Sequence, residues 1–178
     1  MQKQNILKQY GAQDLAVPQE FMPWMRSNHA GETGAVWIYK GAACAFWSKT
    51  IREMAKQHGK VEQQHLIVMA SLVPKNQRSR LLLLWRIMGF GLGFVPSLFG
   101  YSAFCITIKA VETFVEQHYK QQIYVKRLQN GAIERLVQRV FWDRLGQIEL
   151  SQRRLVRGGA RDRDFDHTGR SDGEICAD

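Results

Sequence analysis

The sequence predicts an all-α fold built as a bundle of long helices. Strand signals are nearly absent, because strict apolar–polar alternation is scarce and valine and isoleucine do not cluster between turn residues. Helix-start and helix-stop residues instead bound a series of long segments. The chain has 178 residues, of which 45% are hydrophobic. That is enough for one domain with a sizeable core, and it excludes a wholly disordered chain.

The first two helices are predicted from the residues at their ends. Pro23 can occupy a first helical turn, and we expect a helix over about 23–47. Thr50 and Glu53 form a capping-box pattern. This pattern predicts a second helix over 51–73, which ends before the next proline because a proline disfavours helix in the residue before it.

The second half of the chain continues the helical pattern. An apolar stretch at 81–99 precedes a predicted helix over about 101–128. An Asn-Gly turn at 130–131 then separates it from a last helix over about 132–157. Residues 158–178 are polar, so we expect a helical domain over 1–157 followed by a solvated, disordered tail.

The chain is strongly basic and needs an anionic partner to explain its charge. Lys and Arg number 25 against 16 Asp and Glu, which gives +9, divided into +12 over 1–157 and −3 over 158–178. Nucleic acid and anionic lipid are the usual partners of such a chain. No recognised nucleic-acid module accompanies the basic residues, so we expect no nucleic acid and favour a lipid surface.

Cysteine usage and the N-terminal composition bear on location. The three cysteines are far apart and lack metal-site spacing, so neither a disulfide framework nor a thiolate zinc site is predicted. The first ten residues lack the apolar core of a signal peptide. We therefore expect a reducing environment on the cytoplasmic side.

The apolar stretch also favours a membrane surface. Between Arg86 and Lys109 lie 22 residues without a charge, which is long enough in principle to cross a bilayer. Residues that weaken a straight helix interrupt the stretch, namely Gly89, Gly91, Gly93, Pro96, Ser97 and Gly100. We therefore favour an apolar element lying in the membrane interface, because basic residues flank it. A kinked buried helix followed by a loop is the alternative.

The candidate metal ligands are one carboxylate on each of four predicted helices, together with a histidine. Glu62 and His65 are spaced i, i+3, so both side chains point to one face of the second helix. Glu32, Glu112 and Glu149 lie in three other helices. Carboxylates and a Glu-x-x-His pair in this arrangement hold two metal ions in ferritin-like bundles.

Two spacing coincidences support these ligands. Residues equidistant from a hairpin turn lie side by side, and the midpoint of Glu32 and Glu62 is position 47, near the predicted start of the second helix. The midpoint of Glu112 and Glu149 is 130.5, on the Asn-Gly turn. Four glutamates would balance the charge of two divalent metal ions, whereas four buried carboxylates without metal would be severely unfavourable unless protonated or paired.

Three segments resemble one known family. The run Asn-His-Ala-Gly-Glu-Thr-Gly-Ala at 28–35, the Glu62-x-x-His65 pair and the run at 110–119 are similar to the demethoxyubiquinone hydroxylase family of ubiquinone biosynthesis, over about 25–149. The resemblance implies a ferritin-like four-helix bundle with a carboxylate-bridged di-iron centre, here with an additional apolar, membrane-interfacial helix. It also implies O₂-dependent hydroxylation of a polyprenyl benzoquinone, electrons from NADH or a reductase, and peripheral membrane association, with other ubiquinone-biosynthesis proteins as further partners.

The resemblance also implies a role for each ligand. Glu32 and His65 would bind one iron, and Glu62 would bridge the two irons. Glu112 would bind the second iron, and Glu149 would be the second bridging carboxylate.

One position departs from the family pattern and leaves alternatives open. Gln152 stands where the family's last helix carries a histidine, and a glutamine oxygen is a weaker ligand for ferrous iron than imidazole. The first hypothesis is a di-iron monooxygenase, and the second is a catalytically impaired homologue that binds quinone or lipid. A ferritin-like peroxidase or ferroxidase is the third, but it gives no reason for the apolar stretch at 81–99.

Three further residues near the candidate ligands have assigned or open roles. Tyr119 either reaches the metals or quinone, or packs in the core with a satisfied hydroxyl. His29 is expected to orient a ligand. His58 is expected to be exposed, since lysines lie two residues to either side of it.

Overall fold

The computed structural model describes residues 2–126, 131, 133–140, 142 and 143. Regular elements within these residues are all helices, so the all-α prediction is confirmed there. The elements are α1 (Gln2–Tyr10), η1 (Gln19–Phe21), α2 (Met22–Ala43), α3 (Lys49–Leu72), η2 (Lys75–Gln77), α4 (Leu82–Leu98) and α5 (Tyr101–Lys126). Residues 133–140 are also helical.

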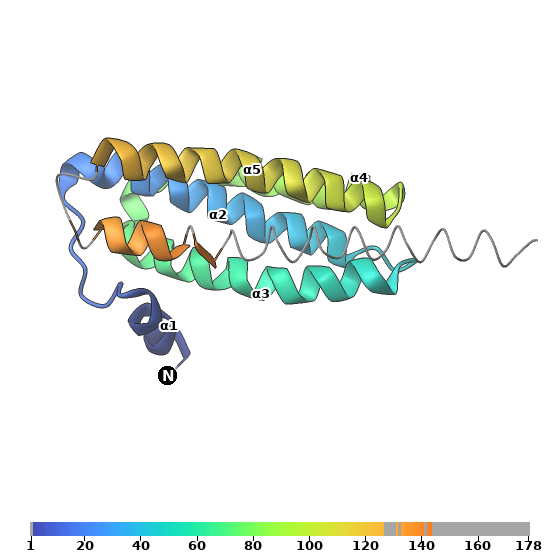
Figure 1. The fold of residues 1–178 in the computed structure, drawn as a ribbon, viewed down its shortest axis with the longest axis horizontal. Coiled ribbons are helices and arrows are strands. Elements are labelled where there is room, and N and C mark those ends of the chain that lie inside the picture. Colours follow the sequence, from blue (N-terminus) through green and yellow to red (C-terminus); the bar gives the residue numbers. More distant parts are fainter. Residues whose placement is uncertain (1, 127–130, 132, 141, 144–178) are drawn as a thin grey trace, which may run out of the picture.

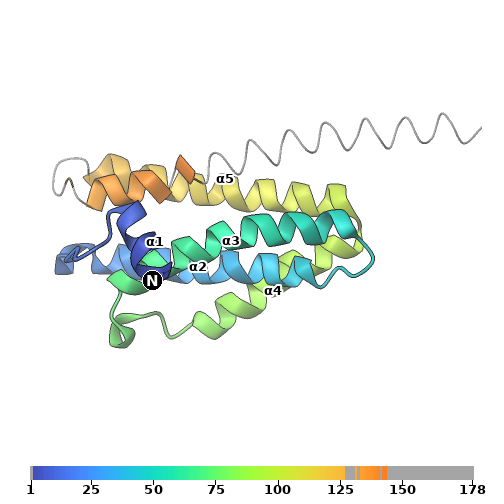
Figure 2. The same ribbon diagram turned by 90° about the horizontal axis from the view of Figure 1, so that it is seen from below.

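The long helices lie side by side along one axis (Figure 1). α2 is the central element, with α3 against one side and α4 against the other (Figure 2). α1 lies at the end of the bundle where residues 133–140 also lie, in both views. The bundle is therefore covered by α1 at one end and by α4 along one side.

The boundaries of the first two long helices differ from the predicted ones. α3 begins at Lys49, because the side chain of Ser48 caps it by accepting a hydrogen bond from the Ile51 amide at 3.3 Å. The capping box predicted at Thr50 is therefore wrong by two residues. α2 ends at Ala43, since the chain then turns and Arg52 donates to the Ala45 carbonyl at 2.9 Å. The predicted end of α3 before the next proline is confirmed.

The core consists of two apolar clusters. One joins α1 to α2, α3 and the helix at 133–140, and includes Tyr10, Met25 and Val68. The other joins α2, α3 and α5, and includes Met54 and Phe104. Along both α2 and α3, the interval between the two clusters holds the predicted metal ligands.

Two glycines of α4 pack against α2, and none of the glycines within α4 interrupts the helix. α4 is continuous from Leu82 to Leu98. A Cβ atom on Gly93 would lie 1.8 Å from the Ile38 carbonyl oxygen, and one on Gly89 would lie 2.3 Å from the Gly34 carbonyl oxygen. The missing side chains let the two backbones approach closely. The interpretation of Gly89, Gly91 and Gly93 as helix interruptions is therefore wrong, whereas the predicted break at Gly100 is confirmed, since Gly100 has φ of +97° between α4 and α5.

The opposite face of α4 is apolar and exposed. Its exposed residues include Leu83, Leu84, Ile87, Met88, Leu92, Val95 and Leu98, of which Leu83 and Ile87 are 67% and 62% exposed. Among the described residues, no helix combines the length and the apolar character needed to cross a membrane. No other described element covers this face of α4.

We expect Gly93→Ala to lower the free energy of unfolding by about 1–3 kcal/mol or more, because the new methyl would overlap a backbone carbonyl. Gly91→Ala is the matched control, since a Cβ there has no neighbour within 4 Å and alanine favours helix. Urea unfolding of both variants makes the measurement. Equal stability of the two would contradict the close α2–α4 contact.

Candidate metal centre

The structure brings three of the predicted ligands together inside the bundle. Glu32 comes from α2, and Glu62 and His65 come from successive turns of α3. Their exposed fractions are 1%, 0% and 0%. One ligand atom from each residue lies within 4.8 Å of the others. Donors on two helices therefore converge on a single point shielded from water.

One atom in this group lacks a hydrogen-bond partner. The Nδ1 atom of His65 lies 3.9 Å from Glu32 Oε2 and 3.7 Å from Glu62 Oε2, beyond hydrogen-bond length. It is buried without any hydrogen-bond partner. A buried nitrogen left in this state is unfavourable. A cation among the three donors would satisfy it, and carboxylate oxygens with an imidazole nitrogen suit iron. The donor set therefore fits a metal ion.

The other ring nitrogen of His65 is engaged. Nε2 lies 3.4 Å from Asp143 Oδ2, and the same carboxylate accepts a hydrogen bond from the Tyr10 hydroxyl. Burial alone would lower the pKa of His65, but the Asp143 carboxylate at Nε2 and the negative charges of Glu62 and Glu32 raise that pKa to about 9. Without metal, the imidazole is therefore held as a cation among carboxylates, and metal binding would displace a proton.

Tyr119 contacts the same group from α5. Its side chain is 1% exposed, and its hydroxyl donates to Glu32 Oε1 at 2.7 Å. The two roles left open for Tyr119 are thus joined, because the ring is buried and the hydroxyl is bonded to a candidate ligand. Tyr119 holds one oxygen of Glu32 and leaves the other facing His65.

A family model for "Ubiquinone biosynthesis protein COQ7" matches residues 19–150 of this sequence, which is most of the chain. The chain belongs to this family. Its fold is accordingly the ferritin-like helical bundle that the sequence predicts. The resemblance to demethoxyubiquinone hydroxylases is confirmed by the same match.

Three proteins that are similar to this chain carry hydroxylase names. A Dictyostelium discoideum protein named "NADPH-dependent 3-demethoxyubiquinone 3-hydroxylase, mitochondrial" is 35% identical over 62% of this chain and 51% of its own length. A Rhodospirillum rubrum protein named "3-demethoxyubiquinol 3-hydroxylase" is 31% identical over 56% and 48%. A Homo sapiens protein with the same name as the first is 30% identical over 56% and 46%. The chain thus spans about half the length of the relatives it matches.

The remaining predicted ligands stand apart from the compact group. Glu112 is buried on α5, with 3% exposed, but it is not one of the three residues that converge. Glu149 lies outside the described residues, as do Gln152 and the tail at 158–178. The Asn-Gly turn is described only at Gly131, which is helical.

Asp143 was missed by the sequence reasoning, although a signal for it exists. Tyr119 and Asp143 have their midpoint at position 131, so they satisfy the same hairpin rule that pairs Glu112 with Glu149. In the structure Tyr119 and Asp143 reach Glu32 and His65. On α5, Tyr119 lies seven residues after Glu112, which is a rise of about 10 Å along the helix. The pairing of Glu112 with Glu149 stays a prediction, because Glu149 lies outside the described residues.

His58 and His29 both lie in the interior, which was not expected of His58. His58 is buried and stacks on Tyr39 with ring centres 5.7 Å apart, so the expectation of an exposed side chain is wrong. His29 is also buried, and its pKa is lowered to about 4 by burial and by the positive charges of Arg78 and Arg86. His29 is thus held neutral on the side of the molecule that carries these arginines.

We expect His29 to make the protein sensitive to acid. Its pKa falls from an ordinary 6.5 to about 4, so the unfolded chain binds the extra proton between these values. The free energy of unfolding is therefore unaffected by His29 above pH 6.5, and it falls by at most about 3 kcal/mol as the pH drops from 6.5 to 4. Urea unfolding from pH 4 to 8 should show a shallower acid-side decline for His29→Gln than for the wild type. Parallel curves throughout would contradict the shift.

Proposed function

We propose that the protein is a di-iron monooxygenase that hydroxylates a demethoxyubiquinone-type polyprenyl benzoquinone. The observation that carries this proposal is the buried group of Glu32, Glu62 and His65, with its unpartnered Nδ1 atom, in a chain of the COQ7 family. The hydroxylase names of the relatives support the substrate and the use of O₂. Iron bound to the group would supply the O₂ chemistry that amino-acid side chains cannot perform.

In this proposal Glu32 and His65 would hold one iron and Glu112 would hold the second. Glu62 and Glu149 would be ligands common to both irons. The two convergent glutamates are fully buried, and a cation between them would offset the unfavourable burial of their negative charges. Electrons would come from a nicotinamide, either directly or through a reductase. The word "NADPH-dependent" in the names of two relatives supports this source.

The surrounding residues would orient the ligands and exclude water. Tyr119 donates to one oxygen of Glu32 and so fixes which oxygen faces the metal. Asp143 accepts from the Nε2 side of His65 and so turns Nδ1 inward. The apolar clusters above and below the group on α2 and α3 keep solvent away. Such preorganised, dry surroundings are what the protein contributes to cofactor chemistry.

The proposal places the protein on the cytoplasmic face of a membrane as a peripheral protein. A polyprenyl quinone resides in the bilayer, so the enzyme must meet a lipid surface. The exposed apolar face of α4 supports such a contact, and Arg78, Arg80 and Arg86 adjoin it in the sequence. Apolar and basic residues combined in this way are typical of helices that lie in the membrane interface.

We expect the purified chain to hold two irons and to form the hydroxylated quinone from demethoxyquinone, O₂ and NADH or NADPH. Glu62→Gln should lose iron and reduce product by more than the 10- to 100-fold typical for a group that merely orients a ligand. Glu53→Gln on the exposed side of α3 is the control. Metal analysis and product mass make the measurement. Full iron occupancy without product would reject the activity.

The second hypothesis, a catalytically impaired homologue that binds quinone or lipid, is supported by Gln152. It predicts one iron or none in the wild type. Gln152→His should then raise iron content and product together, because imidazole binds ferrous iron more strongly than a glutamine oxygen. Two irons already present in the wild type would reject this hypothesis.

We expect the α4 face to carry membrane binding. Leu83 and Ile87 lie one turn apart on that face, and the double variant Leu83→Ser, Ile87→Ser should reduce flotation with vesicles containing phosphatidylglycerol. Phe114→Ser on α5 is a matched control, since Phe114 is 69% exposed and lies on another helix. Equal flotation of the double variant and the wild type would contradict the assignment.

A further inference from the structure

The N-terminal helix α1 reaches the metal group although it lies outside the matched family segment, which starts at residue 19. Its side chains Ile6 and Tyr10, one turn apart, are both buried in the core cluster. Tyr10 is only 2% exposed. The last turn of α1 therefore carries a buried tyrosine into the interior of the bundle.

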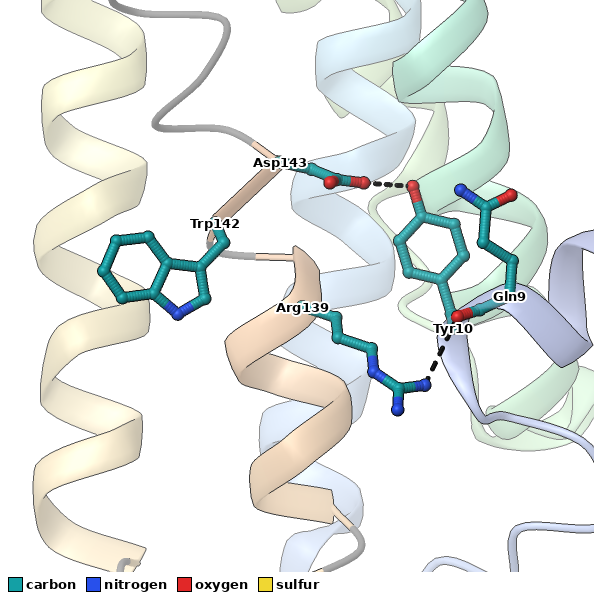
Figure 3. Close-up of a pocket in the computed structure, with 5 residues that line it drawn as sticks. All are labelled: Gln9, Tyr10, Arg139, Trp142 and Asp143. Atoms are coloured by element: carbon teal, nitrogen blue, oxygen red, sulfur yellow. Dashed lines mark hydrogen bonds between the residues drawn. The ribbon is translucent and has the colours of Figure 1, made fainter.

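Tyr10 makes two contacts there, one through its ring and one through its hydroxyl. The ring stands edge-on to the ring of His65, with centres 5.6 Å apart and planes at 89°. The hydroxyl donates to Asp143 (Figure 3). The same carboxylate also faces Nε2 of His65 at 3.4 Å. Tyr10 thus touches the imidazole directly and also holds the carboxylate that accepts from it.

A separate contact holds the end of α1 in place. Arg139 donates from Nη1 to the Gln9 carbonyl at 3.3 Å (Figure 3). Gly11 follows with φ of +69°, and a Cβ atom there would lie 2.6 Å from Arg139 Nη1. These residues adjoin a pocket of about 200 Å³ whose lining includes Trp142. The contact between Arg139 and Gln9 therefore holds the end of α1, and with it Tyr10, next to Asp143.

We propose that Tyr10 is a positioning residue for the metal centre, acting through Asp143 on His65. An acceptor at Nε2 keeps the proton on that nitrogen and leaves Nδ1 as the metal-binding atom. Asp143 has a 42% exposed side chain, so without the Tyr10 hydroxyl its carboxylate is free to turn toward water. The inference rests on the proposed function, because it needs His65 to bind metal. It adds α1 to the elements that build the centre.

The test is anaerobic Fe²⁺ binding to the full chain, with Co²⁺ absorption as a second probe of the ligand set. Tyr10→Phe keeps the ring against His65 and removes only the hydroxyl. We expect Fe²⁺ to bind about 10- to 100-fold more weakly and the Co²⁺ spectrum to change. Tyr39→Phe is the matched control, because Tyr39 is 3% exposed and belongs to the other core cluster.

Variants at the second residue separate positioning from packing. Asp143→Ala should weaken Fe²⁺ binding as much as Tyr10→Phe does, and Asp143→Asn should restore part of it because the amide oxygen still accepts from Nε2. Asp143 is partly exposed, so both variants are expected to fold, which circular dichroism checks.

The outcomes distinguish this inference from the proposed function. A wild type that binds Fe²⁺ while Tyr10→Phe binds it equally well, with an unchanged Co²⁺ spectrum, overturns the role of Tyr10 and leaves the metal centre intact. A loss of affinity in Tyr39→Phe as large as in Tyr10→Phe also overturns it, because the effect is then one of packing. A wild type that takes up no metal overturns the proposed function and this inference with it.

Discussion

The burial of two carboxylates beside one imidazole, between α2 and α3, is the constraint on which the rest of the structure depends. Glu32 and Glu62 are withdrawn from water, and an unpaired buried carboxylate costs several kcal/mol. A protonated His65 offsets only one negative charge. Hydrogen bonds from neighbouring helices supply part of the remainder, as Tyr119 does for Glu32. His65 Nδ1 still has no hydrogen-bond partner, and a cation among the three donors would satisfy it.

Much of this arrangement was predictable because it depends on local spacing. The i, i+3 pair on α3 and the equal distances from each turn follow from helix geometry, so Glu32, Glu62 and His65 could be placed together from the sequence. Asp143 obeys the same hairpin rule, but a lone aspartate without a motif offered no reason to choose it. Tyr10 had no signal beyond its spacing from Ile6, because its role depends on how α1 docks, and docking is a tertiary property.

The glycines of α4 show a second limit of sequence reasoning. Glycine lowers helix propensity, so several glycines in one segment predict an interruption. In α4 that cost is outweighed by packing, because Gly89 and Gly93 allow backbone contact with α2 that any larger side chain would block. Propensity is a weak prior, and tertiary contacts override it where they are this close. The same residues that weaken the isolated helix fix its place in the bundle.

The α2–α4 contact also relates the exposed apolar face to the buried group. Gly34, whose carbonyl meets Gly89, is two residues after Glu32 on α2, a rise of about 3 Å along the helix. One of the close α2–α4 contacts therefore lies within one turn of a proposed metal ligand. From the other side, α1 reaches His65 on α3 through Tyr10. The α2–α3 hairpin thus lies between α4, whose outer apolar face is exposed in the described part of the chain, and α1, whose Tyr10 contacts the ring of His65.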